Sequence, residues 1–160
     1  MRILIVTDAW TPQINGVVVT LTNTIAELTR TGHDVGVISP QQFSTLPCPT
    51  YPDIRLAMFP GRAVAEQIRR FDPEAVHIAT EGPLGIAARR ACIAARRPFT
   101  TAYHTQFPEY VHARSRLPVG VTYAWLRRFH GPATAVMVGT RDIERRLAAR
   151  GFRNLVRWSR

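Results

Sequence analysis

Polar and ionisable side chains recur at four points where an apolar segment of the chain gives way to a loop. Asp8, Glu81 and His104 each follow such a segment directly. A carboxylate can accept hydrogen bonds from hydroxyl groups, and an imidazole can donate or accept one near neutral pH. The candidate ligand-binding residues in these loops (8–16, 80–83, 104–109 and 139–141) are Asp8, Asn15, Gly16, Glu81, His104, Thr105, Glu109 and Thr140, and Val17 joins them at the start of the following helix.

The segments between these loops alternate between strand-like and helix-like patterns. Short apolar runs bounded by turn signals indicate buried strands, and apolar stripes at helical spacing indicate helices. The expected strands are Arg2–Thr7, Asp34–Ser39, Ile54–Met58, Ala75–Ala79, Phe99–Tyr103, Ala133–Val138 and Asn154–Trp158. The expected helices are Val17–Thr31, Arg62–Phe71, Pro83–Arg96, Val119–His130 and Thr140–Arg150. Residues 40–53, which include four prolines, and residues 104–118 are expected to be irregular.

This alternation predicts an α/β fold, a single Rossmann-like three-layer domain over residues 1–160 with a mainly parallel sheet. Ligands of such sheets bind outside the carboxyl ends of the strands, where the strand order reverses. We therefore expect the order to switch beside the first strand. The 8–16 loop, Glu81 and His104 should converge there on one exposed, concave edge.

Composition excludes several classes of protein. The 160 residues are 46% apolar, which suffices for a core, and no run approaches the about 18 apolar residues of a membrane span. There is no secretory signal, and Cys48 and Cys92 lack metal-site spacing, so we expect a reduced, cytoplasmic protein without a bound metal. The formal charge of +10 comes entirely from arginine. It indicates either attraction to anionic partners or compositional drift, and without a reader motif we expect no nucleic-acid binding.

Each candidate motif has two interpretations. Asn15-Gly16-Val17 opens a helix without the glycines of a dinucleotide or P-loop motif, so it is either a tight turn or an anion site formed by free N–H groups. Glu81 precedes a helix that begins with proline, so it caps that helix, binds substrate hydroxyls, or does both, and the sequence favours a mixture in which capping has the larger part. His104 is either a ligand-facing residue or a partly exposed loop histidine. The latter interpretation fits the remaining histidines better, namely His33, His77, His112 and His130.

Six segments, in this order, resemble the N-terminal half of a retaining glycosyltransferase with the GT-B fold. The resemblance is to family 4-like enzymes, in the alpha-mannosyltransferase and glycolipid synthase subgroup, and it covers nearly the whole chain. The segments are RILIVTD (2–8), PQINGV (12–17), EGPLG (81–85), YHTQFPEY (103–110), YAWLRRFH (123–130) and RGFRNLVRWSR (150–160).

The resemblance implies roles for the candidate residues. Gly16, with Asn15 and Val17, would contact the donor diphosphate or sugar, and His104 would lie beside the transferred sugar as the catalytic residue. The acceptor side would be formed by Asp8, Glu81, Thr105 and Glu109. The donor would be a nucleotide sugar such as GDP-mannose or a UDP-hexose, the acceptor a lipid or polyol hydroxyl, and no cofactor is implied.

The nucleotide-sugar half of such enzymes, with its Glu-x7-Glu motif, has no counterpart here. We therefore expect a truncated product or excised domain that is inactive alone. The alternative is a non-catalytic basic module that binds a glycolipid, a phosphate or a partner protein. Residues 112–130 interleave cations with aromatic residues, which suits peripheral contact with an anionic membrane at the inner face of the cell membrane. Positions 119, 123, 126 and 130 equally suit a buried helical stripe.

Overall fold

A six-stranded parallel sheet forms the centre of the computed structural model, which describes residues 1–48, 51–104 and 118–158. The strand order is β2-β1-β5-β6-β7-β8, and every neighbouring pair is parallel. The strands are β1 (Arg2–Val6), β2 (Asp34–Ile38), β5 (Ala75–Ile78), β6 (Thr100–Tyr103), β7 (Ala135–Val138) and β8 (Leu155–Arg157). The predicted α/β class and parallel sheet are confirmed.

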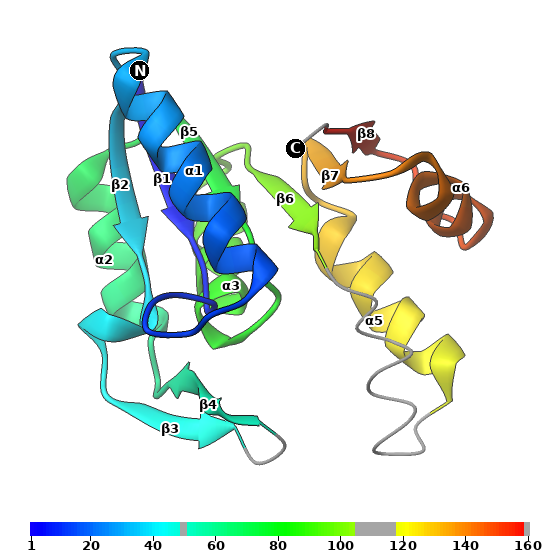
Figure 1. Ribbon diagram of the computed structural model, residues 1–160, viewed down its shortest axis with the longest axis horizontal. Helices are drawn as coiled ribbons and strands as arrows, with labels where there is room; N and C mark the ends of the chain where they lie inside the picture. The colour runs from blue at the N-terminus through cyan, green and yellow to red at the C-terminus, as the bar shows by residue number, and fades with distance from the viewer. Residues whose placement is uncertain (49–50, 105–117, 159–160) are drawn as a thin grey trace.

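Helices cover both faces of this sheet (Figure 1). They are α1 (Gly16–Arg30), α2 (Gly61–Phe71), α3 (Pro83–Ala94), α5 (Val119–His130) and α6 (Arg141–Ala149). Because side chains alternate along a strand, Ile5 packs with Leu21 of α1, whereas Leu4 and Val6 pack in the core beneath α2 and α3. Further along the sheet, Leu126 of α5 packs with residues of the strands and of α6 in a third apolar cluster.

The strand order reverses at β1, as predicted. The chain passes from β1 to β2 on one side and later returns to β5 on the other side of β1. The loops that follow β1 and β5 therefore leave neighbouring strands at the same edge, where open parallel sheets bind their ligands.

The expectation for residues 40–57 is partly wrong. Residues 40–53 are not irregular throughout, because they include the 3₁₀ turn Pro40–Gln42 and the strand β3 (Thr45–Cys48). The strand expected at Ile54–Met58 is β4 (Tyr51–Ala57), and it pairs antiparallel with β3 outside the main sheet. Arg55 stabilises this pair by donating to the Thr45 hydroxyl and carbonyl oxygens, both at 3.0 Å. An apolar run predicts an extended segment but does not identify its pairing partner.

The remaining elements agree with their predicted bounds except at their ends. The largest differences are that α3 ends at Ala94 where Arg96 was expected, and that β7 begins at Ala135 where Ala133 was expected. Helix ends are the least predictable feature because the final turn has alternative hydrogen-bond partners.

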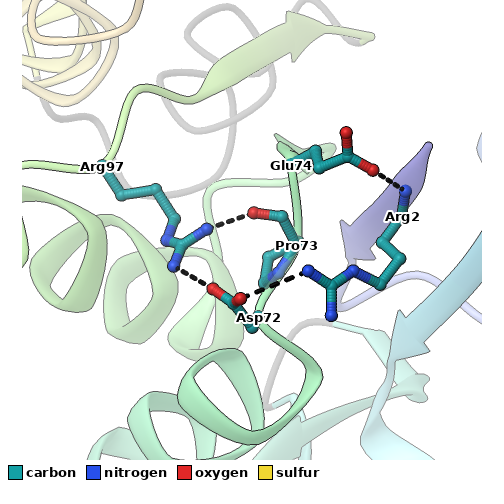
Figure 2. A network of polar contacts seen from close by, with 5 residues as sticks. All are labelled: Arg2, Asp72, Pro73, Glu74 and Arg97. Atoms are coloured by element: carbon teal, nitrogen blue, oxygen red, sulfur yellow. Dashed lines mark hydrogen bonds and ion pairs between the residues drawn. The ribbon is translucent and has the colours of Figure 1, made fainter.

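A polar network closes the opposite edge of the sheet, where the strands begin (Figure 2). Asp72 ends α2 in the left-handed region (φ 45°) and accepts from Arg97 at 2.8 Å and from Arg2 at 3.2 Å. Arg97 also donates to the Pro73 carbonyl, and the Arg2 amide donates to Glu74 at 2.7 Å. This network joins the start of β1 to the turns that precede β5 and β6.

The Asp72 network predicts a pH-dependent contribution to stability. Arg97, and then Arg2, hold the pKa of Asp72 below its ordinary value of 3.8. A carboxyl group with a lowered pKa in the folded state stabilises the fold above its ordinary pKa, and the contribution is lost as the pH falls through the folded-state value. Asp72→Asn, which tolerates the left-handed backbone, should therefore lower the urea midpoint more at pH 7 than at pH 2.5.

The matched control is Asp34→Asn, an exposed aspartate that makes no ion pair within the described residues. It should leave the midpoint unchanged at both pH values. An equal loss for Asp72→Asn at pH 7 and pH 2.5 would contradict the electrostatic explanation.

Candidate functional site

The carboxylate of Asp8 is buried between the loop after β1 and the first turn of α3. Its Oδ1 accepts from the Leu84 amide at 2.9 Å. Its Oδ2 accepts from the Thr80 hydroxyl at 2.8 Å and from the Gly85 amide at 3.3 Å. Burial raises the pKa of Asp8, and these hydrogen bonds oppose the rise. Asp8 therefore caps α3 from another loop, because the residue at the cap position is Gly82, which has no side chain.

Two glycines allow this close approach. A Cβ at Gly82 would lie 2.4 Å from Asp8 Cγ, and a Cβ at Gly85 would lie 1.9 Å from the Thr80 carbonyl oxygen. The Glu-Gly-Pro-Leu-Gly segment is therefore constrained by packing as well as by any contact with a ligand.

Glu81 does not cap α3, which was one of its two interpretations. Its Oε1 lies 3.2 Å from Nε2 of His130, the last residue of α5, and the Glu81 side chain is 15% exposed. His130 is completely buried, and its Nδ1 lies 2.8 Å from the Thr101 hydroxyl. The interpretation of His130 as a partly exposed loop histidine is wrong. The signal for its burial was the helical spacing that it shares with Tyr123 and Leu126.

His77 was also interpreted wrongly as a loop histidine. It lies within β5, where its Nδ1 is 2.9 Å from the Thr100 hydroxyl. Desolvation lowers the pKa of His77 to about 4, and the neighbouring His104 adds to this effect. His77 is therefore neutral at physiological pH.

His104 follows β6 directly and meets the indole of Trp158 edge to face, with ring centroids 6.2 Å apart. The preceding residue, Tyr103, packs in the cluster beneath α5 and α6. Alternation along the strand therefore directs His104 toward the sheet face that carries His77. Trp158, which follows β8, is a neighbour that the sequence analysis did not select.

The start of α1 is partly occupied by its own cap. Asn15 Oδ1 accepts from the amides of Val17 and Val18, both at 3.0 Å, so two of the N–H groups expected to be free are bonded. Gly16 is exposed, and no atom lies within 4 Å of the position that its Cβ would take. An anion at this helix start would therefore bond to the Gly16 amide or replace the Asn15 side chain.

The remaining candidates divide into two groups. Thr105 and Glu109 lie outside the described residues, so their acceptor-side role stays a prediction. Thr140 caps α6 by accepting from the Ile143 amide at 3.2 Å.

Within residues 1–48, 51–104 and 118–158, no cluster of three His, Cys, Asp or Glu side chains could hold a metal ion. In the same part of the chain, no helix has the length and apolar character to cross a membrane.

These features define a Rossmann-like domain with polar residues at the carboxyl ends of β1, β5 and β6. The family model for glycosyltransferase family 4 matches residues 14–159. The chain therefore belongs to glycosyltransferase family 4, which confirms the resemblance seen in the sequence.

Two kinds of curated relative match the chain. It is 25% identical to a GDP-mannose-dependent alpha-mannosyltransferase of Mycobacterium tuberculosis, in an alignment that covers 100% of this chain and 47% of that protein. It is 32% identical to an alpha-monoglucosyldiacylglycerol synthase of Acholeplasma laidlawii, over 73% of this chain and 33% of that protein. A second such synthase, from Streptococcus pneumoniae, is 26% identical over 70% of this chain and 28% of that protein. The chain thus spans less than half the length of these relatives.

The two glycine environments predict opposite effects of the same substitution. Gly85→Ala forces a Cβ into the Thr80 carbonyl and should lower the free energy of unfolding by about 3 kcal/mol. Gly16→Ala places a methyl group in open space on a helix, so the free energy of unfolding should stay the same or rise by up to about 1 kcal/mol. Urea denaturation of the two variants measures the difference. Equal stabilities would contradict the close packing at Gly85.

Proposed function

We propose that this chain forms the acceptor-side half of a hexosyltransferase that moves a mannose- or glucose-type sugar from a nucleotide sugar to a hydroxyl acceptor, with retention of configuration. The observation that carries the proposal is the placement of Glu81 and His104 after neighbouring strands, next to the reversal of strand order, in a member of glycosyltransferase family 4. The names of the relatives support a GDP-mannose donor in one case and a glucosylated diacylglycerol product in the other, and a UDP-hexose donor is the alternative that the family resemblance implies.

Each candidate group has a chemical role suited to its surroundings. The open first turn at Gly16 provides backbone N–H groups and the positive end of the α1 dipole for the donor diphosphate. Glu81 can accept a hydrogen bond from an acceptor hydroxyl group. His104, which is partly exposed at the end of β6, can orient the transferred sugar with one hydrogen bond.

The Asp8 carboxylate supports the acceptor side indirectly. Three donors already occupy its two oxygen atoms, and it is only 5% exposed. We therefore assign to Asp8 the task of fixing the loop that carries Glu81.

Loss of the nucleoside diphosphate requires positive groups that neutralise the developing charge. We propose that these groups lie in a second, C-terminal domain, because the relatives are more than twice as long as the matched region. The proposed reaction then needs both halves.

This proposal predicts that the isolated chain transfers no sugar and that the chain joined to a nucleotide-sugar domain does. In the joined enzyme, His104→Ala should lower kcat at least tenfold, on the order of the loss of one hydrogen bond to the reacting sugar. The matched control is His33→Ala, at the opposite edge of the sheet before β2, which should leave kcat unchanged. Transfer is measured with radiolabelled GDP-mannose or UDP-glucose and a diacylglycerol acceptor.

Two outcomes would contradict the proposal. Full turnover of the His104→Ala enzyme would remove His104 from the site. Binding of a glycolipid or phosphate by the isolated chain, with no transfer by the joined enzyme, would favour the non-catalytic binding module instead.

We further propose that α5 contacts an anionic membrane surface, with its exposed face rather than its whole length. Tyr123, Leu126 and Phe129 are buried, which is the stripe that the helical spacing indicated. Val121 and Trp125 are 57% and 39% exposed. Together with the exposed Arg128 they follow the spacing of one outer helix face.

Co-sedimentation with vesicles tests this surface. Binding to phosphatidylglycerol vesicles should fade with salt and fall several-fold in Trp125→Ser/Arg128→Glu, because each arginine near an anionic surface contributes about 1 kcal/mol. Arg127 is left in place because it donates to the Arg150 carbonyl oxygen at 2.8 Å. Arg62→Glu on α2 is the matched charge control. Equal recovery with anionic and neutral vesicles would contradict the membrane contact.

A further inference from the structure

We propose that His130 is the positioning residue of the acceptor side: it holds one oxygen of the Glu81 carboxylate so that the other accepts a hydrogen bond from the acceptor hydroxyl. This inference rests on the proposed function. It assigns a role to a completely buried histidine, 49 positions along the chain from the carboxylate that it contacts.

The contacts among Thr101, His130 and Glu81 indicate which atom donates and which accepts in each hydrogen bond. An ionised carboxylate only accepts, so His130 Nε2 carries the proton that lies 3.2 Å from Glu81 Oε1. In the neutral ring, Nδ1 is then an acceptor, and the Thr101 hydroxyl at 2.8 Å donates to it. Thr101 is itself completely buried in β6. Glu81 therefore sets the tautomer of His130, and the Thr101 hydroxyl, which can donate or accept, completes the arrangement.

The backbone and ring of His130 are held in place independently of Glu81. Asn154 donates to the His130 carbonyl at 3.2 Å and to the Ala133 carbonyl at 2.6 Å. The imidazole packs edge to face against Phe129 at 5.1 Å and lies 6.1 Å from the Phe152 ring centroid. A side chain that is packed and bonded in this way gives Glu81 a fixed donor.

Both carboxylate oxygens of Asp8 accept hydrogen bonds within the protein, whereas a group that binds a substrate hydroxyl needs an oxygen that is not already bonded. Within the described residues, the Glu81 side chain makes its hydrogen bond to His130 through Oε1, and Oε2 makes none. Glu81 also raises the pKa of Asp8, which shows that the two carboxylates lie close enough to repel each other. The Nε2–H of His130 opposes this repulsion by attracting one oxygen of Glu81. The other oxygen remains for a ligand.

A role in stability alone would have a different signature. A buried histidine that only satisfies its own hydrogen bonds would, when replaced, lower the free energy of unfolding and leave the KM of the folded enzyme unchanged. A positioning residue changes the KM for the acceptor while the KM for the donor stays the same.

The test uses the complete enzyme, in which this chain is followed by its nucleotide-sugar half. His130→Phe fills the aromatic surroundings but cannot donate to Glu81, and should raise the acceptor KM about tenfold with the donor KM unchanged. His130→Gln retains an N–H donor and should recover most of the acceptor affinity. Leu147→Ala is the packing control: Leu147 is buried in the cluster beneath α5 and α6 without a ring contact to His130, so the variant should lower the thermal midpoint but leave the acceptor KM unchanged.

A double-mutant cycle separates action through Glu81 from independent effects. Glu81→Ala and Glu81→Ala/His130→Phe should raise the acceptor KM by similar factors, because His130 has no group to position once the carboxylate is removed. Multiplicative effects, or an unchanged acceptor KM in His130→Phe, would overturn the inference while leaving the proposed function intact. Absence of transfer by the unaltered enzyme would contradict the proposed function instead.

A second measurement does not need turnover. The ¹⁵N chemical shifts of the His130 ring in the complete protein should show a protonated Nε2 and an unprotonated Nδ1, and the Nε2 signal should move in Glu81→Gln. A ring protonated on Nδ1 alone would overturn the inference whether or not sugar is transferred.

Discussion

The buried carboxylate of Asp8 is the interaction on which the carboxyl edge of the sheet depends. It joins the end of β1 to the first turn of α3 through donors from Thr80, Leu84 and Gly85. A carboxylate with so little exposure persists only because these donors replace water and the α3 dipole favours a negative charge. The loop between β5 and α3 is thereby fixed, and Glu81 lies within that loop. A structural carboxylate thus determines where a second carboxylate can act.

Most polar residues that the topology gathers at this edge serve to begin helices. Asn15 caps α1, Asp8 caps α3 and Thr140 caps α6. Their hydrogen bonds leave little capacity for a ligand. Glu81 and His104 are different because neither is part of a helix cap: one contacts a buried imidazole and the other an indole. Clustering at the carboxyl edge therefore identifies a region, and the hydrogen bonds of the helix caps show which residues within it serve the fold.

The sequence predicted the main sheet well because each strand is a short, mainly apolar or β-branched segment between turn signals and each helix has an apolar stripe. The β3–β4 hairpin was missed because strand pairing between Thr45 and Ala57 is a long-range property that local patterns do not contain. Capping of α3 by Asp8 and the contact of His130 with Glu81 were missed for the same reason, since each joins residues far apart in the chain. The helical stripe through Tyr123 and Leu126 did indicate that position 130 faces inward. The stripe could not indicate that the Glu81 carboxylate lies beside His130.

The arginine side chains of α3 and α5 have a consequence for the protein's charge. Arg89 donates to the carbonyls of Arg128 and Phe129, both at 2.8 Å, and Arg127 donates to the carbonyl of Arg150. Each guanidinium thus bonds to carbonyls at the C-terminal end of a helix, and Arg89 does so with a rigid fork of two donors that an ammonium group lacks. A recoded chain with lysine at every arginine position would keep its formal charge of +10 and its attraction to anions. It would lose these guanidinium hydrogen bonds at the helix ends. The charge of these residues and their hydrogen-bonding geometry are therefore separable properties.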